Sequence, residues 1–224
     1  MNERTDWDAY LSVRTKAAYT DKILLRPFLH GDVLEIGCGY GDFAAWCAEE
    51  AGCRVTAIDP SADAIAQASR RFPGVRFLTG VAESLPFENA AFDAVISLEV
   101  AEHLADPRKY FAESFRVLRP GGWMIVQTPN YPVKRVYDLI YRLLRRTPSW
   151  KDDPTHISPF TFKKMKQLAT QSGFRIERLQ ARNILGEKRL PWLAKAKSGR
   201  AGSCLGQKMI LIAQKPPAET PSPS

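Results

Sequence analysis

The stretch VLEIGCGYGDF, residues 33–43, places three glycines at the junction between two kinds of segment. Residues 32–36, DVLEI, are mostly apolar and partly β-branched, which predicts a short buried strand. Residues 43–50, FAAWCAEE, predict a helix. Gly37, Gly39 and Gly41 are therefore expected to form a tight strand-to-helix turn, in which glycine permits a positive φ and lets a ligand approach the backbone.

An acidic residue follows this turn at an informative distance. A second predicted strand, residues 54–58, ends in Asp59, which lies 22 residues after Gly37. At that spacing a carboxylate at the end of the second strand can bind the hydroxyls of a ribose. The segment therefore predicts a nucleoside-binding unit. The alternative is an ordinary α/β turn in which Asp59 caps the next helix.

The charges around the turn indicate which nucleoside compound fits. Dinucleotide sites follow the pattern G-x-G-x-x-G, but here the third glycine comes one position early and Asp42 stands where a small residue is needed. An acid at a helix N-terminus would repel a pyrophosphate. Together with Glu35 and Asp59, it favours a ligand with a ribose and a positive charge. S-adenosylmethionine (SAM) has both and no phosphate, whereas an NAD-dependent dehydrogenase is the weaker interpretation.

Four ordered segments resemble the class I SAM-dependent methyltransferases. They are VLEIGCGYG, VTAIDPS, GVAESLPFENAAFDAVISLEVAEHL and VLRPGGWMIVQTPN, within residues 31–130, and a weaker match, THISPFTFKKMKQLATQSGF, extends to residue 174. Within the class, the chain is similar to the group of ubiquinone-biosynthesis O-methyltransferases and small-molecule methyltransferases. The resemblance implies an α/β fold: a doubly wound, mostly parallel, seven-stranded Rossmann-like sheet with N-terminal helices and a small helical lid.

The rest of the pattern alternates strands with helices, which predicts a parallel sheet covered on both faces. Further strands are expected at 75–80, 92–98 and 123–129, and antiparallel edge strands at 174–181 and 208–215. Further helices are expected over 7–30, after a Ser61 cap, over 107–122 with closure by Gly121 and Gly122, and after a Ser158 cap with Pro159 first and Gly173 past the end.

These elements predict a single methyltransferase domain over residues 1–215, with 131–158 as a lid or substrate insertion. The Pro/Ser-rich segment 216–224 is expected to be disordered. No apolar run approaches the roughly 20 residues that span a bilayer, and the N-terminus lacks a signal-peptide core, so a cytoplasmic location is expected. The four cysteines have no metal-like spacing and are expected to be free thiols.

The net charge of +8 is concentrated in the second half of the chain, because acidic residues outnumber basic ones up to residue 110 and the reverse holds beyond it. This asymmetry favours an anionic partner or surface, and the absence of a nucleic-acid-binding motif argues against DNA or RNA. Residues 131–146 form a basic amphipathic pattern. One interpretation is a lid helix. The other is a helix that also contacts anionic lipid at the inner face of a membrane and collects a lipid-soluble acceptor.

The resemblance also implies roles for individual residues. The glycine turn would face the methionine part of SAM with Glu35 supporting it, and Asp59 would bind the ribose. Adenine would lie at Ala82 and Glu83, and the cofactor would pass near Ser97 and Leu98. Many relatives have an acid directly after the glycine of GVAESLPF, but this chain has Val81. The contact to the adenine amino group is therefore assigned to Glu83 or to a backbone carbonyl.

Catalytic residues are harder to predict, because a methyl sulfonium already carries a good leaving group. A base is needed only when the acceptor arrives protonated. His156, near two aspartates, is the candidate base for a hydroxyl, with a loop-stabilising histidine as the alternative; His103 is the second candidate. The resemblance implies a divalent metal, magnesium or zinc, at Glu99, Glu102 and His103, although the same letters occur in relatives where His103 is structural.

The sequence therefore predicts a SAM-dependent methyltransferase that acts on a small-molecule acceptor. The expected methyl acceptor is a hydroxyl oxygen of a phenolic, quinone-type or other lipid-soluble compound. The alternatives are N- or C-methylation of a soluble metabolite or glycan, and a regulatory protein that binds SAM without catalysis. No feature of the sequence indicates an oligomeric state.

Overall fold

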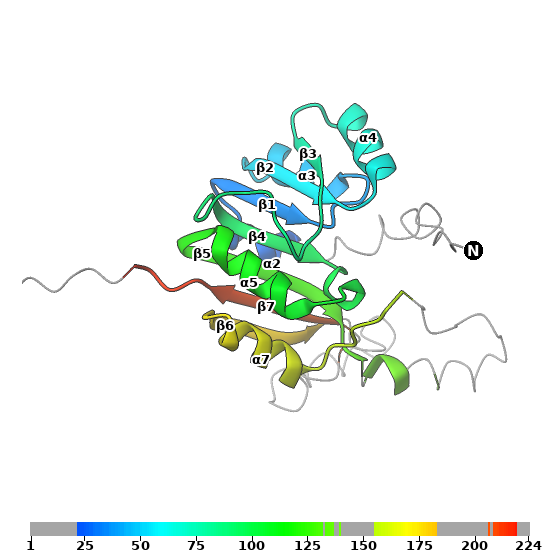
Figure 1. The fold of residues 1–224 in the computed structure, drawn as a ribbon, viewed down its shortest axis with the longest axis vertical. Helices are drawn as coiled ribbons and strands as arrows, with labels where there is room; N and C mark the ends of the chain where they lie inside the picture. The colour runs from blue at the N-terminus through cyan, green and yellow to red at the C-terminus, as the bar shows by residue number, and fades with distance from the viewer. Residues whose placement is uncertain are drawn as a thin grey trace, which may run out of the picture.

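A computed structural model describes residues 22–131, 133–136, 139, 155–182, 206 and 208–218, and these residues form one seven-stranded sheet (Figure 1). The strand order is β3-β2-β1-β4-β5-β7-β6. All neighbouring pairs are parallel except those that involve β7. The strands are β1 Asp32–Ile36, β2 Arg54–Asp59, β3 Arg76–Thr79, β4 Phe92–Leu98, β5 Leu118–Pro129, β6 Arg175–Arg182 and β7 Lys208–Gln214. The predicted fold class is confirmed.

Helices cover both faces of this sheet. α5 and α7 pack on one face, and α2, α3 and α4 contribute to the core on the other. The described helices are α2 Lys22–Leu25, α3 Asp42–Glu49, α4 Ala62–Arg71, α5 Pro107–Val117 and α7 Phe162–Gln171, with the short 3-10 turns η2 Arg26–Phe28 and η3 Ala101–His103.

The two cores follow from the strand period, because successive side chains point to opposite faces. In β4, Val95 packs with the α5 and α7 side, whereas Ala94 and Ile96 pack with the α3 side. All three side chains are fully buried. A strand that is apolar on both faces is typical of the centre of a parallel sheet. The apolar run FDAVISL therefore fixes β4 beside β1, which carries the glycine turn.

The helix predicted over 107–122 is shorter than expected, and Gly121 and Gly122 belong to β5. Proline has no backbone N–H and disfavours helical geometry in the residue before it. Pro120 therefore forces the chain out of the helix, which ends at Val117.

The predicted Ser158 cap of the next helix is also wrong. α7 begins at Phe162 and is capped by Thr161, whose Oγ1 accepts a hydrogen bond from the Lys164 amide at 3.1 Å.

The last strand, β7, was predicted to lie at the edge of the sheet. It lies instead between β5 and β6. Its segment KMILIAQ has Met209 and Leu211 in one core and Ile210 and Ile212 in the other. Both faces must therefore be covered, which an edge position would not achieve. β6, with the sequence RIERLQAR and mostly accessible side chains, takes the edge instead and pairs antiparallel with β7.

An ion network closes the amino ends of the central strands. Asp32 pairs with Arg54 at 2.7 Å and with Arg119 at 3.0 Å, and Arg119 also lies 2.6 Å from Asp93. Hydrogen bonding to Arg54 is the largest influence on Asp32 and holds the pKa of its carboxyl at about 2, below the ordinary value of 3.8. This network stabilises the end of the sheet opposite the glycine turn.

Several predictions fall partly or wholly outside the described residues. Of the helix predicted over 7–30, only residues 22–30 are described; 22–28 are helical, whereas 29 and 30 are not. Of the predicted basic helix, residues 131, 133–136 and 139 are helical. Residues 216–218 are exposed without regular structure, and 219–224 lie outside the description, as does Cys204.

Cys38, Cys47 and Cys53 are buried free thiols, as predicted. Within the part of the chain that the structure describes, no helix is long and apolar enough to cross a bilayer.

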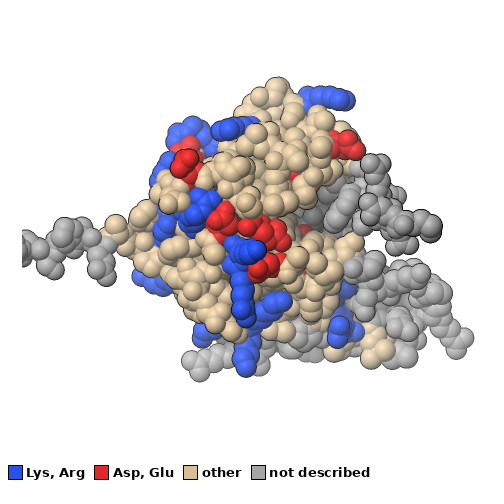
Figure 2. Space-filling view, viewed as in Figure 1, with Lys and Arg blue, Asp and Glu red and all other residues tan. Residues whose placement is uncertain are grey.

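The charged side chains are mixed on the face that carries α5. Figure 2 shows Lys and Arg beside Asp and Glu in the middle of this face, and Lys and Arg alone lower down, over α7. The mixing includes the pair Arg116–Glu113, joined at 2.7 Å. α7 itself carries three lysines, Lys163, Lys164 and Lys166.

Candidate functional site

The glycine turn folds back over the end of β2. Gly37, Gly39 and Gly41 have φ values of +73°, +52° and +81°, in the left-handed region that glycine tolerates. The Gly37 and Cys38 amides both donate to the Ile58 carbonyl, at 2.8 and 3.1 Å, and the Gly41 amide donates to the Cys38 carbonyl at 3.0 Å. The predicted strand-turn-helix is confirmed, and the turn ends at the N-terminus of α3.

Two of the glycines are also required by space. A Cβ added to Gly37 would lie 2.3 Å from Cγ2 of Val100, and one added to Gly41 would lie 2.6 Å from Cζ of Phe77. The turn is therefore a bare backbone surface closely backed by the residues that follow β4 and by β3. Such a surface fits a ligand that approaches the backbone, as the predicted SAM would.

Asp59 ties the turn to the end of β2. Its Oδ2 accepts a hydrogen bond from the Gly39 amide and its Oδ1 accepts one from the Ser61 amide, both at 2.9 Å. The cap of α4 is Ser61, whose hydroxyl accepts from the Ala64 amide, so Asp59 is not the cap. Each carboxylate oxygen has a second lone pair. Asp59 can therefore hold the turn and accept ribose hydroxyls at the same time.

The acidic residues predicted around the turn lie there, but one of them, Asp42, is paired with an arginine. Glu35 is buried in β1, 4% exposed. Asp42 lies in the first turn of α3, as predicted, but Arg71 pairs with it at 2.5 Å. Burial, followed by the charges of Glu35 and Asp59, raises the pKa of the Cys38 thiol far above its ordinary value. Cys38 therefore stays a neutral thiol behind the turn.

The loop after β3 is fixed where adenine is predicted to lie. A bridge joins Val81 to Ser84, and the Leu85 amide donates to Oε2 of Glu113 at 2.7 Å. Ala82 is buried, Glu83 is partly buried, and Val81 is 47% exposed. The assignment of adenine to Ala82 and Glu83 stays a prediction.

Ser97 and Leu98, at the end of β4, direct their side chains into the protein. The Ser97 hydroxyl lies 2.5 Å from the Tyr110 hydroxyl, and both residues are fully buried. Burial raises the pKa of Tyr110 well above its ordinary value, so this pair is neutral. Leu98 is also buried, in the core on the α3 side. What these two residues can offer a ligand at this edge is backbone.

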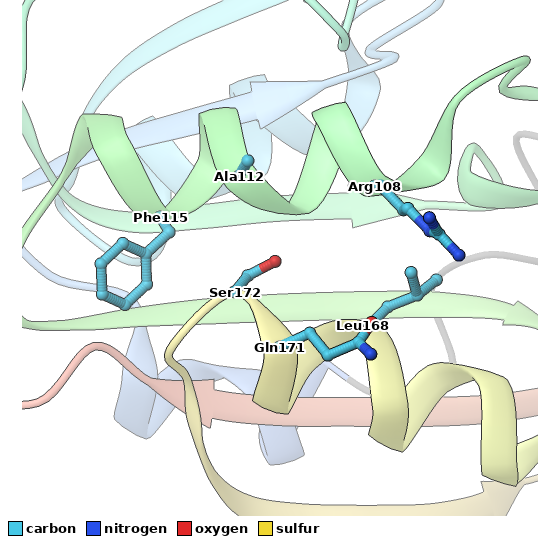
Figure 3. A pocket seen from close by; sticks show the side chains of 6 residues that line it. All are labelled: Arg108, Ala112, Phe115, Leu168, Gln171 and Ser172. Carbon is cyan, nitrogen blue, oxygen red and sulfur yellow. The ribbon is translucent and has the colours of Figure 1, made fainter.

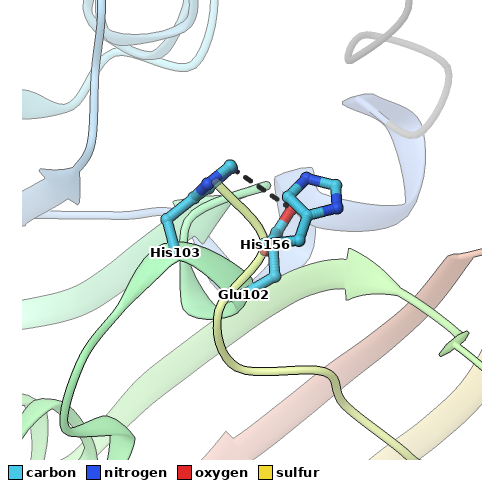
Figure 4. A group of neighbouring side chains, drawn as sticks. All are labelled: Glu102, His103 and His156. Carbon is cyan, nitrogen blue, oxygen red and sulfur yellow. Dashed lines mark ion pairs between the residues drawn. The ribbon is translucent and has the colours of Figure 1, made fainter. Parts of the chain in front are cut away.

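Three predicted residues meet beyond the carboxyl ends of the strands (Figure 4). Glu102 is fully buried, and its Oε2 accepts a hydrogen bond from the Thr128 hydroxyl at 2.8 Å. Its Oε1 lies 3.9 Å from Nε2 of His103. The His103 and His156 rings pack edge to face with centroids 4.7 Å apart. His156, which is 53 residues away in sequence, is thus brought to the histidine that follows β4.

The segment that carries His156 is fastened to η3. Nδ1 of His103 lies 3.1 Å from the Thr155 carbonyl, and the Ser158 amide donates to the Glu102 carbonyl at 2.9 Å. A carbonyl only accepts, so Nδ1 of His103 carries the proton and Nε2 faces Glu102. His156 also packs against Tyr131, with centroids 5.8 Å apart. His103 therefore positions the segment, and His156 lies at the edge where ligands bind in open α/β sheets.

The structure does not support a metal site at Glu99, Glu102 and His103. Oε1 of Glu99 already accepts a hydrogen bond from Nε2 of Gln127 at 3.1 Å and forms an ion pair with Nζ of Lys208 at 3.2 Å. Among the described residues, the group close enough to share an ion is Glu102, His103 and His156, without Glu99. The reason is the position of Glu99, which faces β5 and β7 rather than the histidines.

Sequence reasoning did not identify Gln127, Thr128, Tyr131 and Lys208 as site residues. The first three lie at or just beyond the carboxyl end of β5, so the expected fifth strand ending in QTPN could have indicated them. Lys208 lies 109 residues after Glu99, and nothing in the sequence joins the two. Only the insertion of β7 next to β5 places its ammonium at this edge.

A separate hollow lies between α5 and α7 (Figure 3). It has a volume of about 350 Å³ and is lined by Arg108, Ala112, Phe115, Leu168, Gln171 and Ser172. None of the predicted site residues lines it. It contains no carboxylate or imidazole that could transfer a proton, so the carboxyl edge of the sheet is the better candidate site.

Comparison with known proteins agrees with this geometry. Residues 34–126 match the family model described as a methyltransferase domain. The chain is 35% identical over 146 residues to a probable S-adenosylmethionine-dependent methyltransferase of Mycolicibacterium smegmatis, covering 65% of this chain and 52% of that protein. It is 33% identical over 135 residues to a ubiquinone biosynthesis O-methyltransferase of Parvibaculum lavamentivorans, covering 56% and 51%. The matches thus span about half the length of these relatives.

A solved structure shows the same fold. A SAM-dependent methyltransferase from Methanosarcina mazei aligns with a TM-score of 0.63 at 23% identity, covering 87% of this chain and 98% of that one. At this identity the likeness establishes the architecture alone, because one fold hosts many functions.

Proposed function

We propose that the protein transfers the methyl group of SAM to a hydroxyl oxygen of a small apolar acceptor, because residues 34–126 match a methyltransferase domain and the chain is similar to SAM-dependent methyltransferases. The observation that carries this proposal is the bridge from the Gly39 amide to Asp59, next to a glycine turn with no room for side chains. The turn would receive the methionine part of SAM and Asp59 its ribose.

The chemistry asks little of the protein beyond alignment. When bound, SAM supplies a methyl group on a sulfonium and leaves as a neutral thioether. The protein has to hold the acceptor oxygen about 3 Å from the methyl carbon and exclude water. His156 would take the hydroxyl proton, and its position beside His103 and Tyr131 at the carboxyl edge supports this role.

An apolar acceptor is supported by the distribution of exposed hydrophobic side chains. Among the described residues, the large exposed ones are Val81, Val136, Leu139 and Ile157. Val81 follows β3, Val136 and Leu139 lie in the helix after β5, and Ile157 adjoins His156. All four belong to segments around the candidate site. The similarity to a ubiquinone biosynthesis O-methyltransferase of Parvibaculum lavamentivorans supports an acceptor of this kind.

The same side chains support peripheral contact with an anionic membrane. Lys134 and Arg135 lie in the helix that exposes Val136 and Leu139. Basic and apolar groups on one helix favour the interface of an anionic bilayer. The protein would bind there reversibly and collect its acceptor from the lipid.

The competing function is a protein that binds SAM without catalysis. Incubation with methyl-labelled SAM and a cell extract of the source organism separates the two. A labelled small molecule, absent with His156→Ala, would support the proposal, and its structure would give the methylated atom. SAM binding without any labelled product over several extracts and a panel of phenols would favour the regulatory alternative.

A further inference from the structure

Buried polar side chains gather at the carboxyl ends of β4 and β5. Glu99, Gln127, Thr128 and Asn130 are all less than 10% exposed. The ammonium of Lys208, at the start of β7, joins them, because Lys208 is in register with Pro129 of β5. Buried polar groups are usually retained where they are hydrogen-bonded or functional. This group lies in the edge that the proposed reaction uses.

Glu99 is held there in an unusual conformation. It follows β4 directly and has a φ of +59°, one of two positive values at non-glycine residues in the part of the chain described. Its amide donates to the Gln127 carbonyl at 2.8 Å. Its Oε1 accepts from Nε2 of Gln127 at 3.1 Å and lies 3.2 Å from Nζ of Lys208. Non-glycine residues with a positive φ concentrate at functional sites, and here this conformation occurs at the residue whose carboxylate pairs with the Lys208 ammonium.

The pair lies next to the glycine turn. The residue after Glu99 is Val100, which packs against the turn: a Cβ added to Gly37 would lie only 2.3 Å from Cγ2 of Val100. β4 is also the direct neighbour of β1, which leads into the turn. If SAM binds at the turn, the charges of Glu99 and Lys208 would act on its sulfonium from the neighbouring strand end. Both side chains keep some contact with solvent: taken without its backbone, the Glu99 side chain is 12% exposed and that of Lys208 is 19% exposed.

From this arrangement we infer that Lys208 is a specificity-determining residue that binds the acceptor oxygen as an anion, with Glu99 as its positioning residue. The inference rests on the proposed function. The acceptor hydroxyl gives its proton to His156, and the ammonium holds the resulting oxyanion. The oxygen lone pair then forms the O–C bond while the S–C bond breaks and its electron pair stays on sulfur. The site thus favours acceptors with an acidic hydroxyl, such as a phenol or enol.

The inference also accounts for the ammonium of Lys208 next to the Glu99 carboxylate. A carboxylate beside a methyl-transfer site is otherwise a candidate metal ligand. Here the chain supplies its own cation on β7, with Gln127 completing the hydrogen bonds to Glu99. The alternative is an ion pair that only stabilises the start of β7. The two interpretations differ in what they predict for ligand charge.

Calorimetry with SAM and with S-adenosylhomocysteine tests the electrostatic part without any turnover, since the two ligands differ by one positive charge and a methyl group. Lys208→Met removes the ammonium and leaves the negative charge of Glu99 uncompensated. The affinity for SAM divided by the affinity for S-adenosylhomocysteine should therefore rise about three- to tenfold. Glu99→Gln should lower the ratio by a similar factor, and the double variant should return it close to that of the native protein. Thermal unfolding of each variant confirms that it is folded.

Binding of 4-nitrophenol in the presence of S-adenosylhomocysteine tests the acceptor part, because the phenolate absorbs visible light and the phenol does not. The native protein and Lys208→Arg should convert bound probe to the phenolate at a pH where free probe is mostly neutral, and Lys208→Met should not. Suppose that the native protein binds SAM normally, the variants leave the affinity ratio unchanged, and the bound nitrophenol stays neutral. This result would overturn the inference on Lys208 but not the proposed function. Absence of SAM binding to the native protein would instead overturn the proposed function.

Discussion

The backbone amide of Gly39 donates a 2.9 Å hydrogen bond to Oδ2 of Asp59, which joins the turn after β1 to the end of β2. The second oxygen of Asp59 accepts from the Ser61 amide. One carboxylate thus fixes the glycine turn and the start of α4 while lying where a ribose is expected. Its removal should therefore affect both ligand binding and the folded state.

Asp59→Ala should weaken SAM binding by about 1.5–3 kcal/mol, the scale of a lost hydrogen bond to a charged group. It should also lower the free energy of unfolding by about 1–3 kcal/mol, because two partly buried amides lose their acceptor. Calorimetry and urea unfolding measure the two effects. Asp63→Ala, on the exposed first turn of α4, is the control and should change neither strongly. Unchanged SAM affinity in Asp59→Ala would place the ribose elsewhere.

Gly37→Ala should be far more damaging than Gly52→Ala. Both glycines have a positive φ, +73° and +70°, so both substitutions cost roughly 1–2 kcal/mol of backbone strain. Gly52 has nothing within 4 Å of an added Cβ, whereas Gly37 would collide with Val100. Unfolding and SAM titration of the two variants should separate strain from collision. Val100→Ala in the Gly37→Ala background should recover part of the loss, and similar behaviour of both single variants would contradict the packing argument.

His156→Ala should lower turnover about 10²–10⁴-fold with little change in SAM affinity, as expected of a positioned base. His103→Ala should lower stability by about 1 kcal/mol through loss of the bond to the Thr155 carbonyl. His30→Ala, on an exposed residue before β1, serves as the control. A near-native rate in His156→Ala at saturating acceptor would remove the base role.

Thorough chelation should leave activity unchanged, because Glu99 is paired with Lys208 and no step of the proposed reaction uses a metal. The measurement is the rate with labelled SAM before and after dialysis against a chelator, with magnesium or zinc added back. A loss that either ion restores would assign a metal to Glu102, His103 and His156, the group that the structure brings together.

Asp32→Asn should destabilise the protein at neutral pH by about 1 kcal/mol, the scale of a partly exposed ion pair. The pKa of Asp32 is depressed from 3.8 to about 2 in the folded state. Its stabilising effect is therefore present above pH 4 and is lost as the pH falls through about 2. Denaturant unfolding from pH 7 to pH 2 should show the difference between native protein and variant shrinking over that window. A constant difference would mean that the Arg54 and Arg119 pairs do not set it.

Binding to anionic vesicles should fall on raising the salt concentration and on substitution of Val136 and Leu139 by Glu. Salt screens the attraction of the basic side chains to the lipid, and the two glutamates remove apolar contact area and add repulsion. Lys163→Glu, on α7, controls for a change of charge alone. Negligible sedimentation of the native protein with such vesicles at low salt would leave a water-soluble or protein-bound acceptor as the better proposal.

The sequence by itself determined the parts of this protein that depend on local pattern. The glycine turn, the strand ending in Asp59 and the alternation of strands and helices all follow from residues near one another in the chain, whose spacing fixes backbone conformation. The doubly wound sheet follows in turn, because parallel strands need helical connections. The free thiols and the Ser61 cap could be predicted for the same reason.

Only the tertiary structure decided which distant side chains meet. The run KMILIAQ indicates a strand, but its insertion between β5 and β6 depends on covering both of its apolar faces, and that position brings Lys208 to Glu99. Likewise, His156 reaches His103 because the segment before α7 is fastened to η3, by the Ser158 amide on the Glu102 carbonyl and by Nδ1 of His103 on the Thr155 carbonyl. Contacts between residues about 50 to 110 positions apart depend on packing and strand order, which no local spacing encodes.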